Sequence, residues 1–125
     1  CELLLPLRMM ILKKKYPKRW QALTTLQSHE EARKPGTEAY DETKNIYDQL
    51  QPILQAFSMS LDVVSKICGL IDVNALETNP PEGSVAIYQN ACLLEHQCIA
   101  NTKHSFSLDA KGRPKIIVKA LRAIK

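Results

Sequence analysis

Residues 93–106 read LLEHQCIANTKHSF and follow directly on Cys92. Cys92, His96 and Cys98 thus bring two thiols and an imidazole into seven consecutive positions. Thiolate and imidazole are ligands that zinc prefers, usually four of them in a tetrahedron, but this spacing is not a standard zinc-finger pattern. Taken alone, the pattern favours Cys92 as a small buried apolar residue and His104 as a surface or core histidine. A Cys–His nucleophile pair is the remaining alternative, although nothing in the sequence supplies an oxyanion hole or an orienting residue.

The sequence on both sides of this block predicts short strands. Thr102–Leu108 and Lys115–Lys119 are strand-like runs, and Asp109–Gly112 between them is a strong hairpin signal. Upstream, Pro80–Gly83 marks a turn, and Ala91–Leu94 has the character of a short helical piece. The C-terminal part is therefore expected to consist of short strands and a β-hairpin.

Helical periodicity dominates the chain as far as Gly69 and fades after it, which predicts four helices in the first half. The first carries Leu3, Leu4, Leu7, Met10 and Ile11 on one face and ends in Lys13–Lys15; the second runs from Pro17 to Pro35-Gly36. The third begins at Thr37 with a kink or end at Pro52, and the fourth is opened by Ser60 and closes near Gly69.

Length and composition limit the class of protein. A chain of 125 residues with 45% hydrophobic content can bury one modest core, in one compact unit or two lobes. No stretch approaches the roughly 20 uninterrupted apolar residues of a membrane span, so no membrane association is expected. Four cysteines without a secretory signal indicate reduced thiols and a cytoplasmic or nuclear protein rather than a disulfide framework.

Charge is divided into three blocks. Residues 1–36 hold eight basic and three acidic side chains, residues 37–77 two and seven, and residues 78–125 seven and three. The basic run Lys13–Arg19 is interpreted as a solvated helix end, with a nuclear-localisation or nucleic-acid patch as the alternative. A nucleic-acid-binding module is disfavoured because the basic residues are interleaved with acids and few aromatics are offered for stacking. No Gly-rich phosphate loop, HExxH or GxSxG occurs, so the commonest nucleotide-binding and hydrolase signatures are absent.

The block LLEHQCIANTKHSF resembles the LLNHSCxPNxxxxF motif of SMYD-type SET proteins, a family of protein-lysine methyltransferases. Residues 71–76 (IDVNAL) are similar to the family's strand that carries a cofactor-contacting Asn, and residues 83–88 (GSVAIY) to its GxGLYP-like segment. Residues 117–125 (IVKALRAIK) are similar to its LRAxRxIxxGEE region and stop short of the GEE. The resemblance covers residues 67–125, and residues 1–66 occupy the place of the family's helical SET-I insert.

That resemblance implies an α+β, mainly helical fold: a SET-I-like insert at residues 1–66, then part of a SET core at residues 67–125 with a C-terminal hairpin. It also implies S-adenosylmethionine as cofactor and in-line methyl transfer to a substrate lysine, with positioning supplying most of the rate. Asn74, Glu95 and His96 take the cofactor-binding positions. Cys98 takes one zinc-ligand position, completed in the family by three cysteines of a post-SET segment.

No residue of the chain can be named as catalytic, because the family's catalytic tyrosine lies just past the GEE. We therefore expect a fragment that is inactive alone. Glu95 stands where the motif has Asn; its charge would attract the ammonium of the cofactor and repel its carboxylate, while Gln97 and Ala100 replace a Ser and a Pro. Two functions stay open: a parent methyltransferase acting on histone or non-histone proteins in transcriptional regulation, or a SET-derived scaffold that works through protein contacts.

Overall fold

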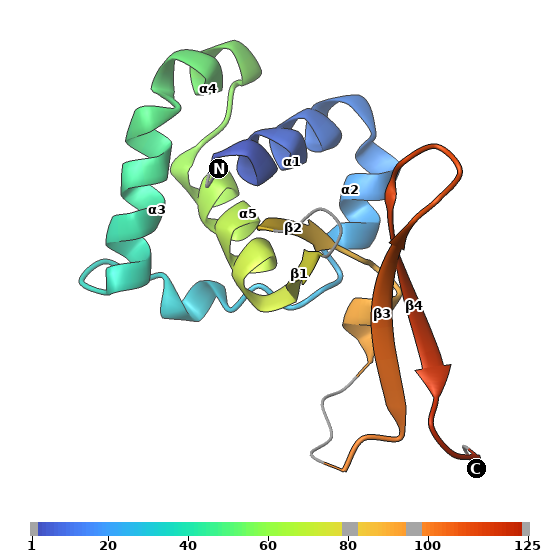
Figure 1. Cartoon of the computed structure of the whole chain (residues 1–125). Coiled ribbons are helices and arrows are strands. Elements are labelled where there is room, and N and C mark those ends of the chain that lie inside the picture. The colour runs from blue at the N-terminus through green and yellow to red at the C-terminus, as the bar shows by residue number, and fades with distance from the viewer. Residues whose placement is uncertain (1–2, 79–82, 95–98, 124–125) are drawn as a thin grey trace. The chain divides into compact units, whose positions relative to one another are not determined.

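The computed structural model describes residues 3–78, 83–94 and 99–123. Two compact units make up the fold, Cys1–Asn74 and Ala75–Lys125 (Figure 1). The sequence placed the boundary after residue 66, but the last helix of the first unit runs across that position to Asn74. As expected, the fold is mixed α+β and rich in helix, with helices in the first unit and two small antiparallel sheets in the second.

The helical unit contains, in chain order, α1 (Leu4–Lys15), α2 (Pro17–Leu23), the short 3-10 helix η1 (Glu30–Ala32), α3 (Glu38–Gln49), α4 (Gln51–Phe57) and α5 (Leu61–Asn74). The second unit contains β1 (Ala75–Thr78), β2 (Ser84–Ile87), the short 3-10 helix η2 (Ala91–Leu93), β3 (Thr102–Leu108) and β4 (Pro114–Ala120).

Several helix ends and starts follow local signals in the sequence. Three lysines close α1, where positive charge meets the negative end of the helix dipole, and Pro17 lies in the first turn of α2, where its missing N–H is not needed. The Thr37 hydroxyl caps α3 by accepting the backbone N–H of Tyr40 at 3.2 Å. α3 ends at Gln49, close to the kink or end expected at Pro52, and Pro52 lies in the first turn of α4.

Two predictions about helix ends are wrong. The second helix does not continue to Pro35: α2 ends at Leu23, and residues 24–29 form a connection without helical structure before η1. The fourth helix does not close near Gly69 but continues to Asn74, so residues 71–74 are helical and the strand expected at 71–76 begins only at Ala75.

The core of the first unit lies around α5, which packs against α1 and α3. Val64, Ile67 and Leu70 on its inner face are fully buried. Burying a side chain of this size stabilises a fold by about 1.5–3 kcal/mol. Within the described part of the chain, the core is formed by Met9, Met10, Leu26, Leu50, Leu54, Met59, Val64, Ile67, Cys68 and Leu70, beside the buried Pro6.

The predicted C-terminal hairpin is confirmed. β3 and β4 pair antiparallel from Thr102 opposite Ala120 to Leu108 opposite Pro114. In the connecting turn the Asp109 carboxylate accepts the backbone N–H groups of Lys111 at 2.8 Å and of Arg113 at 2.9 Å, and the Arg113 Nε–H at 2.7 Å. These bonds, led by the backbone N–H of Arg113, lower the pKa of Asp109 from 3.8 to about 2.

The second unit has little buried apolar surface. β1 pairs antiparallel with β2, and of the residues described between 75 and 123 only Thr78 is buried, with 1% exposed. Large hydrophobic side chains stay exposed, namely Val85, Leu93, Leu94, Ile99, Leu108, Val118 and Leu121. A two-stranded sheet is only marginally stable by itself. These exposed apolar side chains are surface on which further packing could stabilise the unit. No helix in the described ranges has the length and apolar character needed to cross a membrane.

Candidate functional site

Of the four residues predicted to bind cofactor or metal, the structure describes only Asn74. Glu95, His96 and Cys98 lie outside the described residues. Asn74 is the last residue of α5, with 8% of its surface exposed. The cofactor-binding and zinc-binding assignments of these four residues therefore stay predictions.

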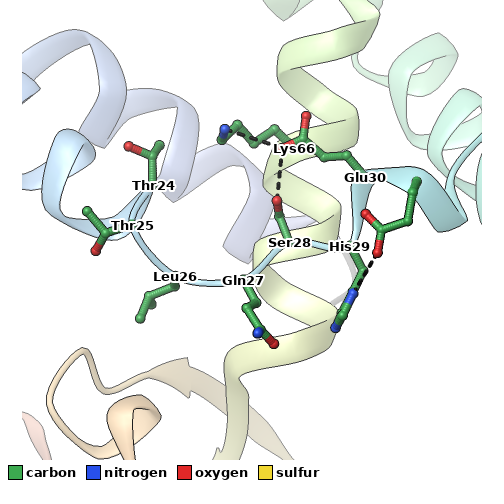
Figure 2. Close-up of a pocket in the computed structure, with 9 residues that line it drawn as sticks. Thr24, Thr25, Leu26, Gln27, Ser28, His29, Glu30 and Lys66 are labelled. Carbon is green, nitrogen blue, oxygen red and sulfur yellow. Dashed lines mark hydrogen bonds and ion pairs between the residues drawn. The ribbon is translucent and has the colours of Figure 1, made fainter.

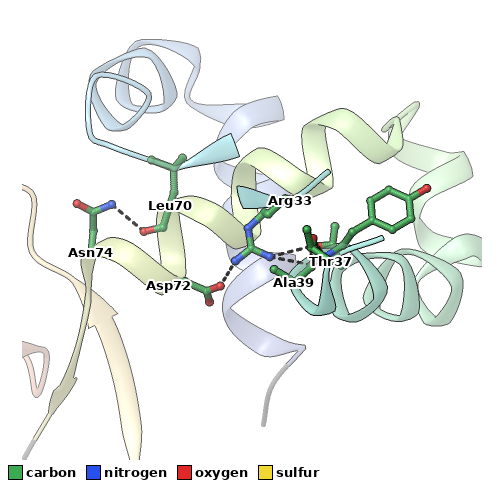
Figure 3. A network of polar contacts seen from close by, with 8 residues as sticks. Arg33, Thr37, Ala39, Leu70, Asp72 and Asn74 are labelled. Carbon is green, nitrogen blue, oxygen red and sulfur yellow. Dashed lines mark hydrogen bonds and ion pairs between the residues drawn. The ribbon is translucent and has the colours of Figure 1, made fainter. Parts of the chain in front are cut away.

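Asn74 ties the end of α5 to the connection that follows α2. Its side-chain amide donates to the Gln27 carbonyl at 2.7 Å and to the Leu70 carbonyl at 2.9 Å, and the second bond is visible in Figure 3. An amide nitrogen carries two hydrogens, and both are used here. Contact between this nitrogen and a ligand would therefore require that one of the two bonds be broken.

The same connection lies directly against Gly69. A Cβ atom added at this glycine would lie 3.0 Å from the carbonyl carbon of Ser28 and 3.3 Å from its Cβ, and closer still to its carbonyl oxygen. A hydrogen at Gly69 is thus what lets the backbone of Ser28 approach α5. The sequence suggested a helix-ending role for this residue, whereas the structure gives it a packing role inside the helix.

Side-chain contacts also join the segment after α2 to α5 nearer the start of that helix. Lys66 forms an ion pair with Glu30 at 3.3 Å, and the Ser28 hydroxyl donates to the same carboxylate at 2.9 Å. His29, which has a left-handed backbone conformation with φ of 44°, pairs with Glu31 at 2.8 Å (Figure 2). The hydrogen bond with His29 is the main cause that lowers the pKa of Glu31.

An open pocket of about 540 Å³ lies over this segment, as Figure 2 shows. Its lining is mainly polar and consists of Thr24, Thr25, Leu26, Gln27, Ser28, His29, Glu30, Glu31 and Lys66. The hydroxyls of Thr24 and Thr25 donate to the carbonyls of Gln21 at 2.9 Å and Ala22 at 2.7 Å. Both hydroxyls thus bind carbonyl groups of the last turn of α2. The pocket is the space left between residues 24–31 and Lys66 of α5.

A buried arginine, Arg33, follows η1 and holds the end of the segment that joins α2 to α3. The Arg33 side chain is 6% exposed and donates to the Ala39 carbonyl at 3.1 Å, to the Thr43 hydroxyl at 2.9 Å and to Asp72 (Figure 3). Burial raises the pKa of the neighbouring Cys68 thiol, against the opposing effects of the Arg33 charge and a hydrogen bond with Thr43. The thiol is therefore protonated at neutral pH and is a packing residue rather than a nucleophile.

In the second unit, His104 is a surface histidine, one of the two positions expected for it, whereas Cys92 is half-buried rather than buried. Cys92 is half-buried, and burial raises the pKa of its thiol, which disfavours the thiolate that a nucleophile needs. His104 is exposed on β3, with its ring edge-to-face to Phe106 at 5.4 Å between centroids. Phe106 also contacts the Tyr88 ring at 5.9 Å.

The Tyr88 hydroxyl is buried, and no described residue makes a hydrogen bond to it. Burial raises the pKa of Tyr88, so the phenol is neutral at physiological pH. Tyr88 closes the GSVAIY segment and follows directly on β2, so the contact with Phe106 brings the ends of two segments of the resemblance together. Tyr88 entered the sequence comparison only as the last residue of the GSVAIY segment, and the buried position of its hydroxyl depends on the contact with Phe106, which is distant in sequence.

Among residues 3–78, 83–94 and 99–123, no group of three or more His, Cys, Asp or Glu side chains could hold a metal ion. Comparison of the chain with models of protein families, with curated proteins and with solved structures found no match.

Proposed function

We propose that the protein containing this chain is a SET-type protein of the SMYD family, which transfers a methyl group from S-adenosylmethionine to a lysine of a protein substrate. The order of motifs carries the proposal: GSVAIY at 83–88, LLEHQCIANTKHSF at 93–106 and IVKALRAIK at 117–125 follow one another as in the family pattern. Chance similarity in three successive segments is improbable. The proposed substrates are histones or other proteins of the nucleus and cytoplasm.

Three features of the fold support this assignment. A helical unit precedes the three segments named above, which is the order that the SET-I insert and these motifs have in the family. The hairpin β3–β4 begins within the LLEHQCIANTKHSF segment and ends within the IVKALRAIK segment, so two of the matched motifs share one ladder. The second unit buries almost none of its described apolar side chains, which fits part of a larger β fold better than an independent domain.

The alternative, a SET-derived scaffold without cofactor, is supported by Asn74 and Glu95. Both hydrogens of the Asn74 amide nitrogen are donated to carbonyls of the helical unit, which leaves that nitrogen no donor for a cofactor. Glu95 adds a negative charge at the position where the family's Asn holds the amino-acid end of the cofactor. In this case the protein would act through contacts with other proteins.

Calorimetric titration of S-adenosylmethionine into the full-length protein, beside Glu95→Asn and Glu77→Gln variants, separates the two functions. Micromolar binding by the unmodified protein supports the methyltransferase. Binding that occurs only in the Glu95→Asn variant supports the scaffold, and Glu77→Gln controls for the loss of one negative charge at an exposed position of β1. Absence of binding in all three proteins would count against a cofactor site at these residues.

A further inference from the structure

The β3–β4 hairpin has two chemically different faces. The register pairs Lys103 with Lys119, Ser105 with Ile117 and Ser107 with Lys115. Because side chains alternate between the faces of a strand, these six residues share one face. All three lysines are exposed. We call this surface, made of Lys103, Ser105, Ser107, Lys115, Ile117 and Lys119, the lysine face.

The positive charge of the lysine face is not balanced within the hairpin. Neither Thr102–Leu108 nor Pro114–Ala120 contains an Asp or Glu, and the carboxylate at the turn, Asp109, is paired with Arg113. Within the described ranges, none of the three lysines takes part in an ion pair. Lys103 and Lys119 lie directly opposite each other, an arrangement of like charges that destabilises a sheet.

We propose that the lysine face is a docking surface for an extended acidic segment of a partner protein. Carboxylates that bridge Lys103 and Lys119 would relieve the repulsion between them. On β4 the face runs Lys115, Ile117, Lys119, so the complementary segment carries acid, apolar and acid residues at alternate positions. One carboxylate of the segment then contacts Lys115, the other contacts Lys119 and the neighbouring Lys103, and the apolar side chain between them covers Ile117. This inference does not depend on the proposed function.

Two other occupants fit the surface less well. A second copy of the same face would bring three lysines against three lysines. Single-stranded nucleic acid uses aromatic side chains for stacking, and the lysine face offers two serines and Ile117 in their place. The central Ile117 instead suits contact with an apolar side chain.

The experiment titrates the 125-residue chain into a fluorescein-labelled peptide centred on Glu-Thr-Val-Thr-Glu and follows fluorescence anisotropy. A Lys103→Gln/Lys119→Gln double variant is expected to bind about fivefold to tenfold more weakly, since exposed ion pairs contribute modestly. A Lys103→Arg/Lys119→Arg variant should bind as the unmodified chain does. Lys15→Gln/Lys18→Gln, which removes two exposed charges from the first unit, should have little effect.

Circular dichroism of each variant checks that the fold is retained, and a Lys115→Gln single variant, which should also bind more weakly, takes the place of the double variant if that protein does not fold. Three results would overturn the proposal. The first is no measurable binding by the unmodified chain at low salt. The second is an equal loss of affinity in the Lys15→Gln/Lys18→Gln control, which indicates attraction by net charge alone. The third is tighter binding of a labelled single-stranded oligonucleotide than of the acidic peptide.

Discussion

Replacing Gly69 by alanine tests the close contact between α5 and the connection after α2. Gly in the interior of a helix is less favourable than Ala by about 0.5–1 kcal/mol, so propensity alone predicts that Gly69→Ala stabilises the protein. The structure predicts the opposite sign. The added Cβ would lie 3.0 Å from the carbonyl carbon of Ser28 and closer to its oxygen, and this neighbour is backbone that cannot rotate away.

Overpacking of this kind costs about 1–3 kcal/mol. Movement of the Ser28 backbone would also strain the adjacent bond from Asn74 to the Gln27 carbonyl. We therefore expect Gly69→Ala to lower the free energy of unfolding by about 1–2 kcal/mol after the gain in propensity is subtracted. Urea unfolding followed by circular dichroism at the helix band measures this change as a lower midpoint.

Ser65→Ala, a substitution to alanine on the same helix, is the control and should be neutral or slightly stabilising. Adding Ser28→Gly to Gly69→Ala should not restore stability, because the shortest contacts of the added Cβ are with the carbonyl group of Ser28, which glycine retains. A Gly69→Ala protein as stable as the unmodified protein, or more stable, would refute the reasoning.

Three further perturbations have defined outcomes. Arg33→Met keeps the apolar stem but removes the donors to Thr43 and Asp72; the free energy of unfolding should fall by about 1–3 kcal/mol in urea titrations, and an unchanged midpoint would contradict the buried network. Thr37→Ala should lower the free energy of unfolding by about 1 kcal/mol because it removes the cap of α3, and Thr37→Ser should keep most of that stability because serine can also cap. Because the pKa of Asp109 is about 2 in the fold and 3.8 ordinarily, its contribution is present above pH 3.8 and is lost as pH falls toward 2. In the folded protein the NMR amide shifts of Lys111 and Arg113 should titrate about a midpoint near pH 2, the pKa of Asp109 in the fold, whereas an Asp109→Asn protein should show none of this transition.

Elements with local signals were predictable from the sequence. The Thr37 cap, Pro17 in a first turn and the turn at Asp109 each act on residues within a few positions, so the sequence around them contains the reason for the structure. The hairpin bounds were correspondingly close to those observed. The interruption expected near Pro52 is present: α3 ends at Gln49, and Pro52 lies in the first turn of α4, where its missing backbone N–H is not needed.

The end of α2 and the role of Gly69 were not predictable, since both depend on contacts across some forty residues. Residues 24–29 have helix-compatible side chains, but the carbonyl of Gln27 bonds Asn74 and the backbone of Ser28 rests on Gly69. The hydrogen bonds of Asn74 were not predictable either. The family motif indicates a cofactor contact at this position, whereas in the fold its amide donates to two carbonyls of the helical unit. Arg33, paired with Asp72, likewise had no local signal.

The attachment of residues 24–33 to α5 has a consequence for hydrogen exchange. Lys66, Gly69, Asp72 and Asn74 each contact this connection at a different point along α5, so it cannot lift away while the C-terminal half of that helix is intact. Two segments distant in sequence should then open together as one cooperative unit, with similar opening free energies for their amide protons. The hydrogen-bonded amides of Leu26, Ala32 and Arg33 should then exchange with the same opening free energy as the helix turns that hold them.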